Sequence, residues 1–403
     1  MLSLAAIREA RDRIADVARV TPIEYSHTFS ERTGAAVHLK LENFQRTGAF
    51  KIRGALNRIT TLSDAEQAAG VVTASAGNHA QGVALAATRA GVDATIVMPE
   101  HAPISKVKAT RSYGARVVLA GVDYEEAQAR AHEIEREEGR TYVHAFDDEM
   151  VMAGQGTIGL EIVSQQPDVE TVIVPIGGGG LIAGIATAIK AQQPDVRVIG
   201  VQAEGAASVA ESLAAGEIRE RDSVDTVADG IATRSVGTQP FAIIQERVDE
   251  VVTVSDEEIA LAITLLLQRS KTLVEGAGAV ALSALLEGRF EYDDDEVIVP
   301  ALCGGNIDMN VLTTVILRGM IQLGRYLKIR TVLPDQPGAL EGLIEIIADK
   351  GANIYEIHHE RASREVGMSD TSVELELETH GPDHAADLLA TLRDAGYTVD
   401  VRK

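Results

Sequence analysis

The sequence contains one cysteine, no tryptophan and few basic residues. A single cysteine in 403 residues excludes an internal disulfide framework and gives no support to a thiolate metal site. The 37 Lys and Arg residues face 60 Asp and Glu residues, and the net charge of −23 argues against nucleic acid as a partner. No apolar run reaches the ~18 uncharged residues of a membrane span, and the N-terminus has no signal-peptide core. These absences predict a soluble, cytoplasmic protein without a membrane partner.

Short apolar runs alternate with amphipathic stretches from about residue 71 to 121. The alternation resumes with TVIVPI (171–176), LIAGIATAIKAQ and VRVIGVQAE, and DEVIVPAL (295–302) reads as a further buried strand. Continuous Val and Ile runs are typical of parallel strands that helices cover on both faces. The sequence therefore predicts an α/β fold with parallel sheets, and Ser255 and Glu258 predict a capping box that opens a long helix.

The pattern changes after about Lys328. The order becomes strand, helix, strand, strand, helix, strand, and SVELELE (372–378) alternates as a half-exposed strand does. We predict a separate C-terminal α+β domain over residues 328–403.

The first motif with chemical potential is TGAFKIRGA (47–55), which places Lys51 between an aromatic residue and a helix start. A lysine shielded from water has a lowered pKa and can form a Schiff base with an aldehyde cofactor. A lysine whose stem packs on the surface while its amine stays in water is the structural alternative.

The second motif is SAGNHAQG (75–82), where a strand enters a helix. Exposed N–H groups with hydroxyl and amide side chains at a helix N-terminus can bind a carboxylate. A helix start capped by Ser and Asn explains the same residues equally well.

Two glycine turns each follow a predicted strand. The tetraglycine 177–180 can wrap its backbone N–H groups around a phosphate, although it matches neither a Walker loop nor a dinucleotide fingerprint. The turn CGGN (303–306) ends the strand VIVPAL, and the ends of parallel strands share one crevice. A structural turn and an inert core cysteine remain the alternatives.

Together, TGAFKIRGA, SAGNHAQG, GGGG and CGGN resemble, in this order and spacing, the type II (tryptophan-synthase-β-like) pyridoxal-phosphate enzymes. Within that fold the likeness is to the threonine ammonia-lyases, also called threonine dehydratases. The resemblance covers about residues 1–325. It implies a large catalytic domain from 1–46 and 150–325, a small one from 47–149, and pyridoxal 5'-phosphate as the cofactor between them.

The resemblance assigns roles residue by residue. Lys51 matches the Schiff-base lysine and general base, and Cys303 matches the position facing the pyridine nitrogen. The other cofactor-binding positions are Phe50, Asn78, Gly177, Gly178, Gly179, Gly180, Leu181 and Glu275. The substrate carboxylate is expected at Ser75, Ala76, Gly77, Asn78 and His79.

Two departures from relatives are informative. Serine racemases carry a second serine where this sequence has Ala76, which disfavours racemisation. Several relatives bind a cation through a glutamate that aligns with Gln202 here, so no metal is predicted.

The C-terminal segment, with PDQPGAL and ADKGANI, resembles an ACT domain, which in this family carries amino-acid regulation. The resemblance implies a homodimer or homotetramer and a branched-chain amino acid as effector. The expected effector residues are Asp335, Gly338, Ala339, Leu340, Asn353 and Ile354. An inert oligomerisation module is the alternative.

The implied activity is removal of the α-proton and the β-hydroxyl of L-threonine, which yields 2-oxobutanoate and ammonia; L-serine would yield pyruvate. A serine dehydratase or racemase, a threo-3-hydroxyaspartate lyase and a non-catalytic amino-acid sensor are the alternatives. Threonine and serine differ by a methyl group worth ~1–3 kcal/mol of discrimination, so the residues leave the substrate preference open. They also leave open whether the enzyme serves isoleucine biosynthesis or threonine breakdown.

Overall fold

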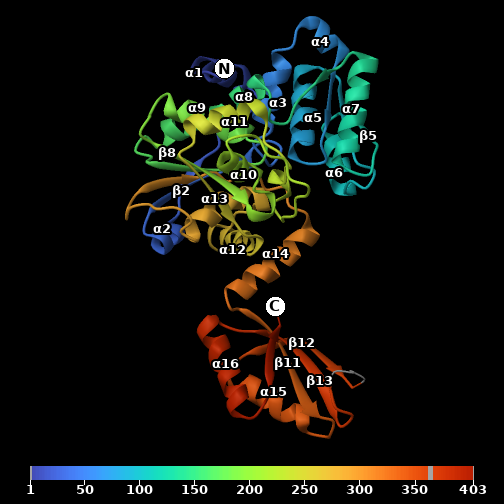
Figure 1. Ribbon diagram of the computed structural model, residues 1–403, viewed down its shortest axis with the longest axis vertical. Helices are drawn as coiled ribbons and strands as arrows, with labels where there is room; N and C mark the ends of the chain where they lie inside the picture. Colours follow the sequence, from blue (N-terminus) through green and yellow to red (C-terminus); the bar gives the residue numbers. More distant parts are fainter. Residues whose placement is uncertain (1, 362–365, 403) are drawn as a thin grey trace. The chain divides into compact units, whose positions relative to one another are not determined.

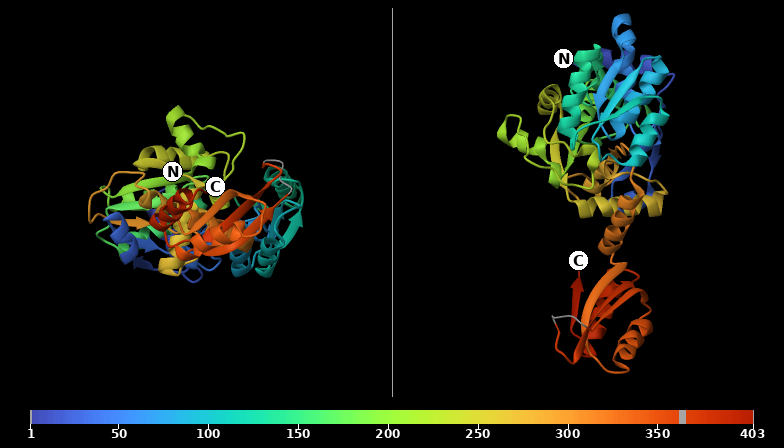
Figure 2. Two further views of the ribbon diagram at one scale, coloured as in Figure 1. Left: turned by 90° about the horizontal axis from the view of Figure 1, so that it is seen from below. Right: turned by 90° about the vertical axis from the view of Figure 1, so that its right-hand side faces the viewer.

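The computed structural model describes residues 2–361 and 366–402, and it divides the chain into two compact units, 1–308 and 309–403. Figure 1 traces the chain from the blue N-terminus to the red C-terminus, and Figure 2 adds two views. In the described residues no helix is both long enough and apolar enough to cross a membrane.

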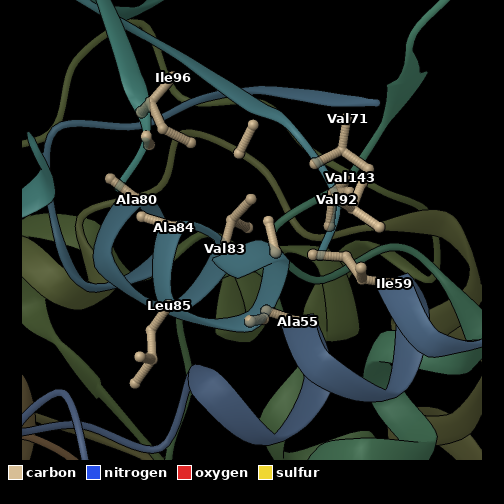
Figure 3. Close-up of a cluster of buried hydrophobic side chains, with 14 of the residues drawn as sticks. Ala55, Ile59, Val71, Ala80, Val83, Ala84, Leu85, Val92, Ile96 and Val143 are labelled. Carbon is tan, nitrogen blue, oxygen red and sulfur yellow. The ribbon is translucent and has the colours of Figure 1, made fainter. Parts of the chain in front are cut away.

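The first unit contains a four-stranded parallel sheet of order β5-β4-β3-β6. Its elements are β3 (Val71–Ala74), α5 (Asn78–Ala90), β4 (Ala94–Met98), α6 (Ile104–Ser112), β5 (Arg116–Leu119), α7 (Tyr124–Glu138) and β6 (Thr141–Tyr142). Val71 and Ile96 point into a core shared with α5, which Figure 3 shows, whereas Val72 and Val97 pack with α7 on the opposite face. The predicted strand–helix alternation is confirmed, and its apolar strands are covered on both faces.

The same unit contains a six-stranded sheet of order β1-β2-β10-β7-β8-β9, parallel except for the β1–β2 pair. Its strands are β1 (Ile23–Tyr25), β2 (Ala36–Lys40), β7 (Thr171–Pro175), β8 (Arg197–Ala203), β9 (Glu250–Val254) and β10 (Val297–Pro300). The helices α8 (Glu149–Gln165) and α9 (Gly180–Lys190) share a core with Val172 and Val174. The helix α13 (Gly276–Leu286) contacts β7, β8 and β9 outside that core, so it lies on the other face.

The remaining helices of this unit connect or flank the sheets. They are α1 (Leu4–Ile14), α2 (His27–Thr33), α3 (Ile52–Thr60), α4 (Asp64–Ala69), α10 (Ser208–Ala215), α11 (Thr238–Arg247) and α12 (Asp256–Leu265), with 3-10 turns at Glu42–Phe44, Glu204–Ala206 and Asp229–Ile231 and a π-helical turn at Leu266–Ser270. The predicted capping box of Ser255 and Glu258 is present at the start of α12.

Helix α3 is held against α8 by glycine contacts and buried charges. A Cβ atom on Gly154 would lie 2.6 Å from the Cα of Gly54, so the two helix backbones approach as closely as glycine allows. This approach brings Arg53 of α3 to Glu161 of α8, with Nη1 and Oε1 2.6 Å apart, while Arg53 also binds Glu42 at 2.7 Å. Arg53 and Glu42 are buried and Glu161 is nearly so, and the two ion pairs fix the start of α3.

Lys40 completes this buried charge network. Its Nζ donates to Glu161 at 2.6 Å, to the carbonyl of Thr21 at 2.8 Å and to Gln165 at 3.0 Å. Two cations and two carboxylates therefore balance one another across β2, the turn that follows it, α3 and α8.

The second unit has the βαββαβ order predicted for the C-terminal domain. Its elements are α14 (Met309–Gln322), β11 (Tyr326–Pro334), α15 (Ala339–Asp349), β12 (Asn353–Glu360), β13 (Asp370–Glu378), α16 (Pro382–Asp394) and β14 (Val399–Arg402). The sheet is antiparallel with order β12-β13-β11-β14, which is ferredoxin-like. Leu343 and Leu388 pack the two helices α15 and α16 onto the buried side chains of β11 and β13.

We predict that Arg53→Met lowers the free energy of unfolding by ~3–5 kcal/mol, because it leaves the buried Glu42 carboxylate without its arginine and leaves Glu161 with Lys40 as its remaining cation. Urea unfolding at equilibrium measures the loss. Arg130→Met is the matched control, since solvent screens the exposed Arg130–Glu133 pair and its loss should change the stability little. Equal losses in the two variants would contradict the structural role of the buried network.

Candidate active site

Lys51 lies directly before α3, at the end of a segment that runs beside the turn after β10. The N–H of Phe50 donates to the carbonyl of Cys303 at 3.1 Å, which sets the position of the neighbouring lysine. The Lys51 Nζ donates to the carbonyl of Ala145 at 2.9 Å and lies 5.1 Å from the centroid of the Phe50 ring. The structure therefore brings Lys51, Phe50 and Cys303 together.

Burial changes the ionisation of this group of side chains. It lowers the pKa of Lys51 to about 8, because loss of hydration destabilises the charged ammonium more than the neutral amine. The same effect raises the pKa of the Cys303 thiol, whose Sγ donates to the carbonyl of Ala301 at 3.4 Å. The site thus combines an amine that can lose its proton near neutral pH with a thiol that keeps its own.

Asn78, at the first turn of α5, is held from two sides. Its Nδ2 donates to Glu275 at 2.6 Å, and its Oδ1 accepts from Asn306 at 2.8 Å. Burial raises the pKa of Glu275 to about 7, and the nearby Asp229 adds to this rise. A Cβ atom on Gly304 would lie 2.1 Å from the Glu275 carboxylate, so the CGGN turn needs glycine there.

Residues 75–77 join β3 to α5, and Asn78 and His79 belong to the first turn of α5. The Ser75 hydroxyl accepts from the N–H of Gly77 at 3.2 Å, and space is open beside the Gly77 Cα. Ala76 packs on the core of the four-stranded sheet. The His79 Nε2 lies 3.0 Å from the carbonyl of Val143, and burial lowers the pKa of this ring to about 3, so it is neutral.

The tetraglycine joins β7 to α9. In the described structure the N–H groups of Gly177, Gly178 and Gly179 have no hydrogen-bond acceptor, so they are available to an anion. A Cβ atom on Gly178 would lie 2.4 Å from three ring atoms of Phe146, and one on Gly177 would lie 3.0 Å from the Cα of Ile231. Close packing by these neighbours explains why the loop is glycine, and Gly180 and Leu181 begin the buried helix behind it.

Sequence reasoning did not identify Ala145, Phe146 or Ile231. Ala145 acts through its backbone carbonyl, while Phe146 and Ile231 act by packing on glycine. Apolar residues in loops carry no sequence signal for such contacts, and only the fold brings them to the site.

Gln202, which the resemblance matches to a cation-binding glutamate, uses both the oxygen and the nitrogen of its amide in hydrogen bonds. Its Oε1 accepts from the N–H groups of Val209 and Ala210, and its Nε2 donates to the carbonyl of Ala206, all at 3.0 Å. This amide thus serves as an internal cap for the segment after β8.

The C-terminal unit has a pocket of about 160 Å³ at the start of α15. Its polar side chains include Asp335 and Arg361, whose Oδ1 and Nε atoms are 3.2 Å apart. The complete lining is Leu333, Pro334, Asp335, Gln336, Pro337, Ala339, Leu340, His359, Arg361 and Thr371.

Of the six expected effector residues, Asp335, Ala339 and Leu340 line the pocket, and Gly338 caps α15 with a left-handed backbone. Asn353 and Ile354 lie at the opposite end of β12 from His359, where Asn353 binds Glu378. The structure therefore does not bring those two residues to the pocket.

Comparison with known proteins gives a consistent result. Residues 14–304 match the family model described as pyridoxal-phosphate dependent enzyme. The chain is 51% identical over 403 residues to an L-threonine ammonia-lyase from Geobacter sulfurreducens, covering 100% of both chains. A solved threonine deaminase from Solanum lycopersicum is 42% identical with a TM-score of 0.76, covering 78% of this chain and 92% of that one. Maize serine racemase is 36% identical with a TM-score of 0.75, covering 80% and 98%.

We predict that the Lys51 amine in cofactor-free protein becomes reactive around pH 8, because burial disfavours its ammonium form. The extent of acylation at Lys51 by a small amine-reactive reagent, measured by mass spectrometry from pH 6 to 11, gives the midpoint. Lys108, whose side chain is exposed, is the internal control in the same digest. A Lys51 midpoint that coincides with that of Lys108 would contradict the effect of burial.

Proposed function

The chain belongs to the pyridoxal-phosphate dependent enzymes, and from this membership we propose that it is a threonine ammonia-lyase. It deaminates L-threonine to 2-oxobutanoate and ammonia, and by the same chemistry L-serine to pyruvate. The observation that carries this function is the half-buried Lys51 amine, which lies near Cys303 and donates to the Ala145 carbonyl, one residue before the Phe146 ring that packs on the tetraglycine. The full-length match to a threonine ammonia-lyase supports threonine as the substrate.

The residues present fit pyridoxal phosphate. The free N–H groups of Gly177 to Gly179 at the start of α9 would hold the phosphate, and Asn78 would hold the ring hydroxyl. The neutral thiol of Cys303 would face the ring nitrogen without placing a charge there. When bound, the cofactor delocalises the electron pair that remains after the α-proton leaves.

Lys51 is the residue that moves the α-proton. With its pKa lowered to about 8, a part of the amine is neutral at physiological pH and can accept a proton from the substrate. The Ala145 carbonyl accepts from Nζ at 2.9 Å and holds the amine in place without adding charge. Lys51 is therefore both the anchor for the cofactor and the base.

The segment 75–79 orients the substrate. The Ser75 hydroxyl and the start of α5 supply donors for the substrate carboxylate, and open space beside Gly77 leaves room for it. Ala76 offers no proton to the second face of the α-carbon, so elimination is favoured over racemisation.

We also propose that residues 47–149 form the small catalytic domain and that 1–46 with 150–308 form the large one; the boundary expected at 325 moves to 308, because α14 belongs to the second compact unit. The four-stranded sheet, from Val71 to Tyr142, lies within the first range, and the six-stranded sheet takes its strands from the flanking segments. Residues 145 and 146 then link the two: Lys51 donates to the Ala145 carbonyl, and the Phe146 ring packs on Gly178.

We predict that Lys51→Ala abolishes 2-oxobutanoate release from L-threonine and removes the visible absorbance of bound cofactor, because both depend on the Nζ atom. Coupled detection of the 2-oxo acid and an absorbance spectrum give the two readouts. Lys108→Ala, an exposed lysine of α6, should leave both unchanged. Full activity in Lys51→Ala would overturn the assignment of the base.

The pocket of the C-terminal unit supports a regulatory role, with a free branched-chain amino acid as the effector. Asp335 can bind the ammonium and Arg361 the carboxylate of a zwitterion that inserts between them, while Leu333 and Leu340 offer apolar contact to an aliphatic side chain. The unit then acts as the ACT domain that its order of strands and helices resembles, and pairing of two chains stays a prediction.

We predict that the full chain binds L-isoleucine or L-valine at a saturable site, which isothermal titration detects as heat. Arg361→Ala should weaken this binding at least ~10-fold, because a charge-assisted hydrogen bond is lost. Arg393→Ala, on the last turn of α16, is the control. Heat that persists unchanged in Arg361→Ala, or no heat with either amino acid, would contradict an effector site at this pocket.

A further inference from the structure

The turn that follows β6 is closed by the imidazole of His144. Its Nδ1 atom accepts hydrogen bonds from the N–H of Phe146 at 3.2 Å and from the N–H of Asp147 at 2.8 Å. A ring nitrogen that accepts is unprotonated, so these bonds assign the neutral form with its proton on Nε2. Burial lowers the pKa of His144, which favours the same form.

One peptide group transmits this contact to Lys51. The carbonyl of Ala145 and the N–H of Phe146 belong to the same planar trans peptide and point in opposite directions. His144 holds the N–H side, and the carbonyl side accepts from Lys51 Nζ at 2.9 Å. The imidazole thus fixes the direction in which the acceptor of the lysine points, and each hydrogen bond polarises the next.

The far end of the turn is fixed as well. The Asp147 carboxylate accepts from the N–H groups of Thr238 and Gln239 at the start of α11, at 3.0 and 3.1 Å. The Phe146 ring packs against Gly178 of the tetraglycine. The peptide between Ala145 and Phe146 therefore cannot rotate freely, and its carbonyl is a rigid rather than an adaptable acceptor.

A carbonyl at this position differs from a carboxylate in its effect on the amine. It accepts a hydrogen bond from Nζ in both protonation states, yet it carries no net charge that would raise the pKa of Lys51. Lys51 can then hold a fixed place while its proton is gained and lost, provided that the carbonyl keeps its direction.

We propose that His144 is a positioning residue for Lys51, acting through the peptide between Ala145 and Phe146. This inference rests on the proposed function in so far as Lys51 is the base. His144 contacts neither substrate nor cofactor in this account, and its effect on the reaction is the direction of one carbonyl.

The test compares His144→Ala with His144→Asn in the full chain loaded with pyridoxal phosphate. The amide oxygen of Asn can occupy the place of Nδ1 and accept the same two N–H groups, whereas Ala cannot. We expect His144→Ala to lower kcat for L-threonine by roughly 10- to 100-fold, as small misplacements of a catalytic group do. KM should change less than about threefold, because the substrate segment 75–79 is a separate element, and His144→Asn should recover most of the lost kcat.

A second readout does not depend on turnover. The rate at which cofactor-free protein captures pyridoxal phosphate, followed by its visible absorbance, should fall in His144→Ala and recover in His144→Asn. His132→Ala is the matched control: this ring stacks on Tyr142 with centroids 4.3 Å apart, and it should leave both rates unchanged.

Unchanged kcat and capture rate in His144→Ala, or equal losses in the Ala and Asn variants, would overturn the proposal. If His144→Ala does not fold, His144→Gln replaces it, because its amide oxygen lies one bond farther out; equal rates in the Gln and Asn variants would then count against the inference. Wild-type protein that captures the cofactor but does not deaminate L-threonine would contradict the proposed function alone, and the capture rates would still decide the role of His144.

Discussion

Burial removes much of the hydration of Lys51 Nζ. The surrounding protein must therefore supply the hydrogen-bond acceptor and the contacts that water would otherwise provide. A neutral carbonyl accepts one of its protons, the Phe50 ring lies beside it, and the backbone of 48–51 is fixed by hydrogen bonds to the turn after β10. Two residues farther along, Arg53 locks the start of α3 onto Glu42 and Glu161. These contacts hold the Lys51 amine in one place. A general base must be held in a fixed position to accept a proton from the substrate.

Much of this architecture could be predicted from local patterns. The Val and Ile runs, the glycine turns and the capping box each reflect forces that act within a few residues, and β3 to β5, β7, β8 and α12 formed where those patterns indicated. The order βαββαβ of the C-terminal unit was predictable for the same reason. The motifs TGAFKIRGA, SAGNHAQG and CGGN also meet, through the Phe50–Cys303 and Asn78–Asn306 hydrogen bonds. The tetraglycine packs on Phe146, whose neighbour Ala145 accepts from Lys51.

The contacts that could not be predicted join residues far apart in the chain. Arg53 and Glu161 are 108 positions apart, and Lys51 and Ala145 are 94 apart. Neither pair has a sequence signature, because the sequence does not show whether an arginine, a glutamate or the carbonyl of an alanine is buried. The pocket of the C-terminal unit shows the same limit: PDQPGAL pointed to Asp335 and Leu340, but His359 and Arg361 reach the pocket only because β12 runs beside β13.

The balance of products tests the central claim most directly. Purified full-length protein, loaded with pyridoxal phosphate, would be given L-threonine, and 2-oxobutanoate and ammonia would be quantified in the same samples over time. We expect both products to accumulate in equal amounts, with L-serine giving pyruvate and ammonia in the same ratio. Cofactor-loaded, folded protein that releases neither product, or that converts L-threonine to another stereoisomer without releasing ammonia, would contradict it.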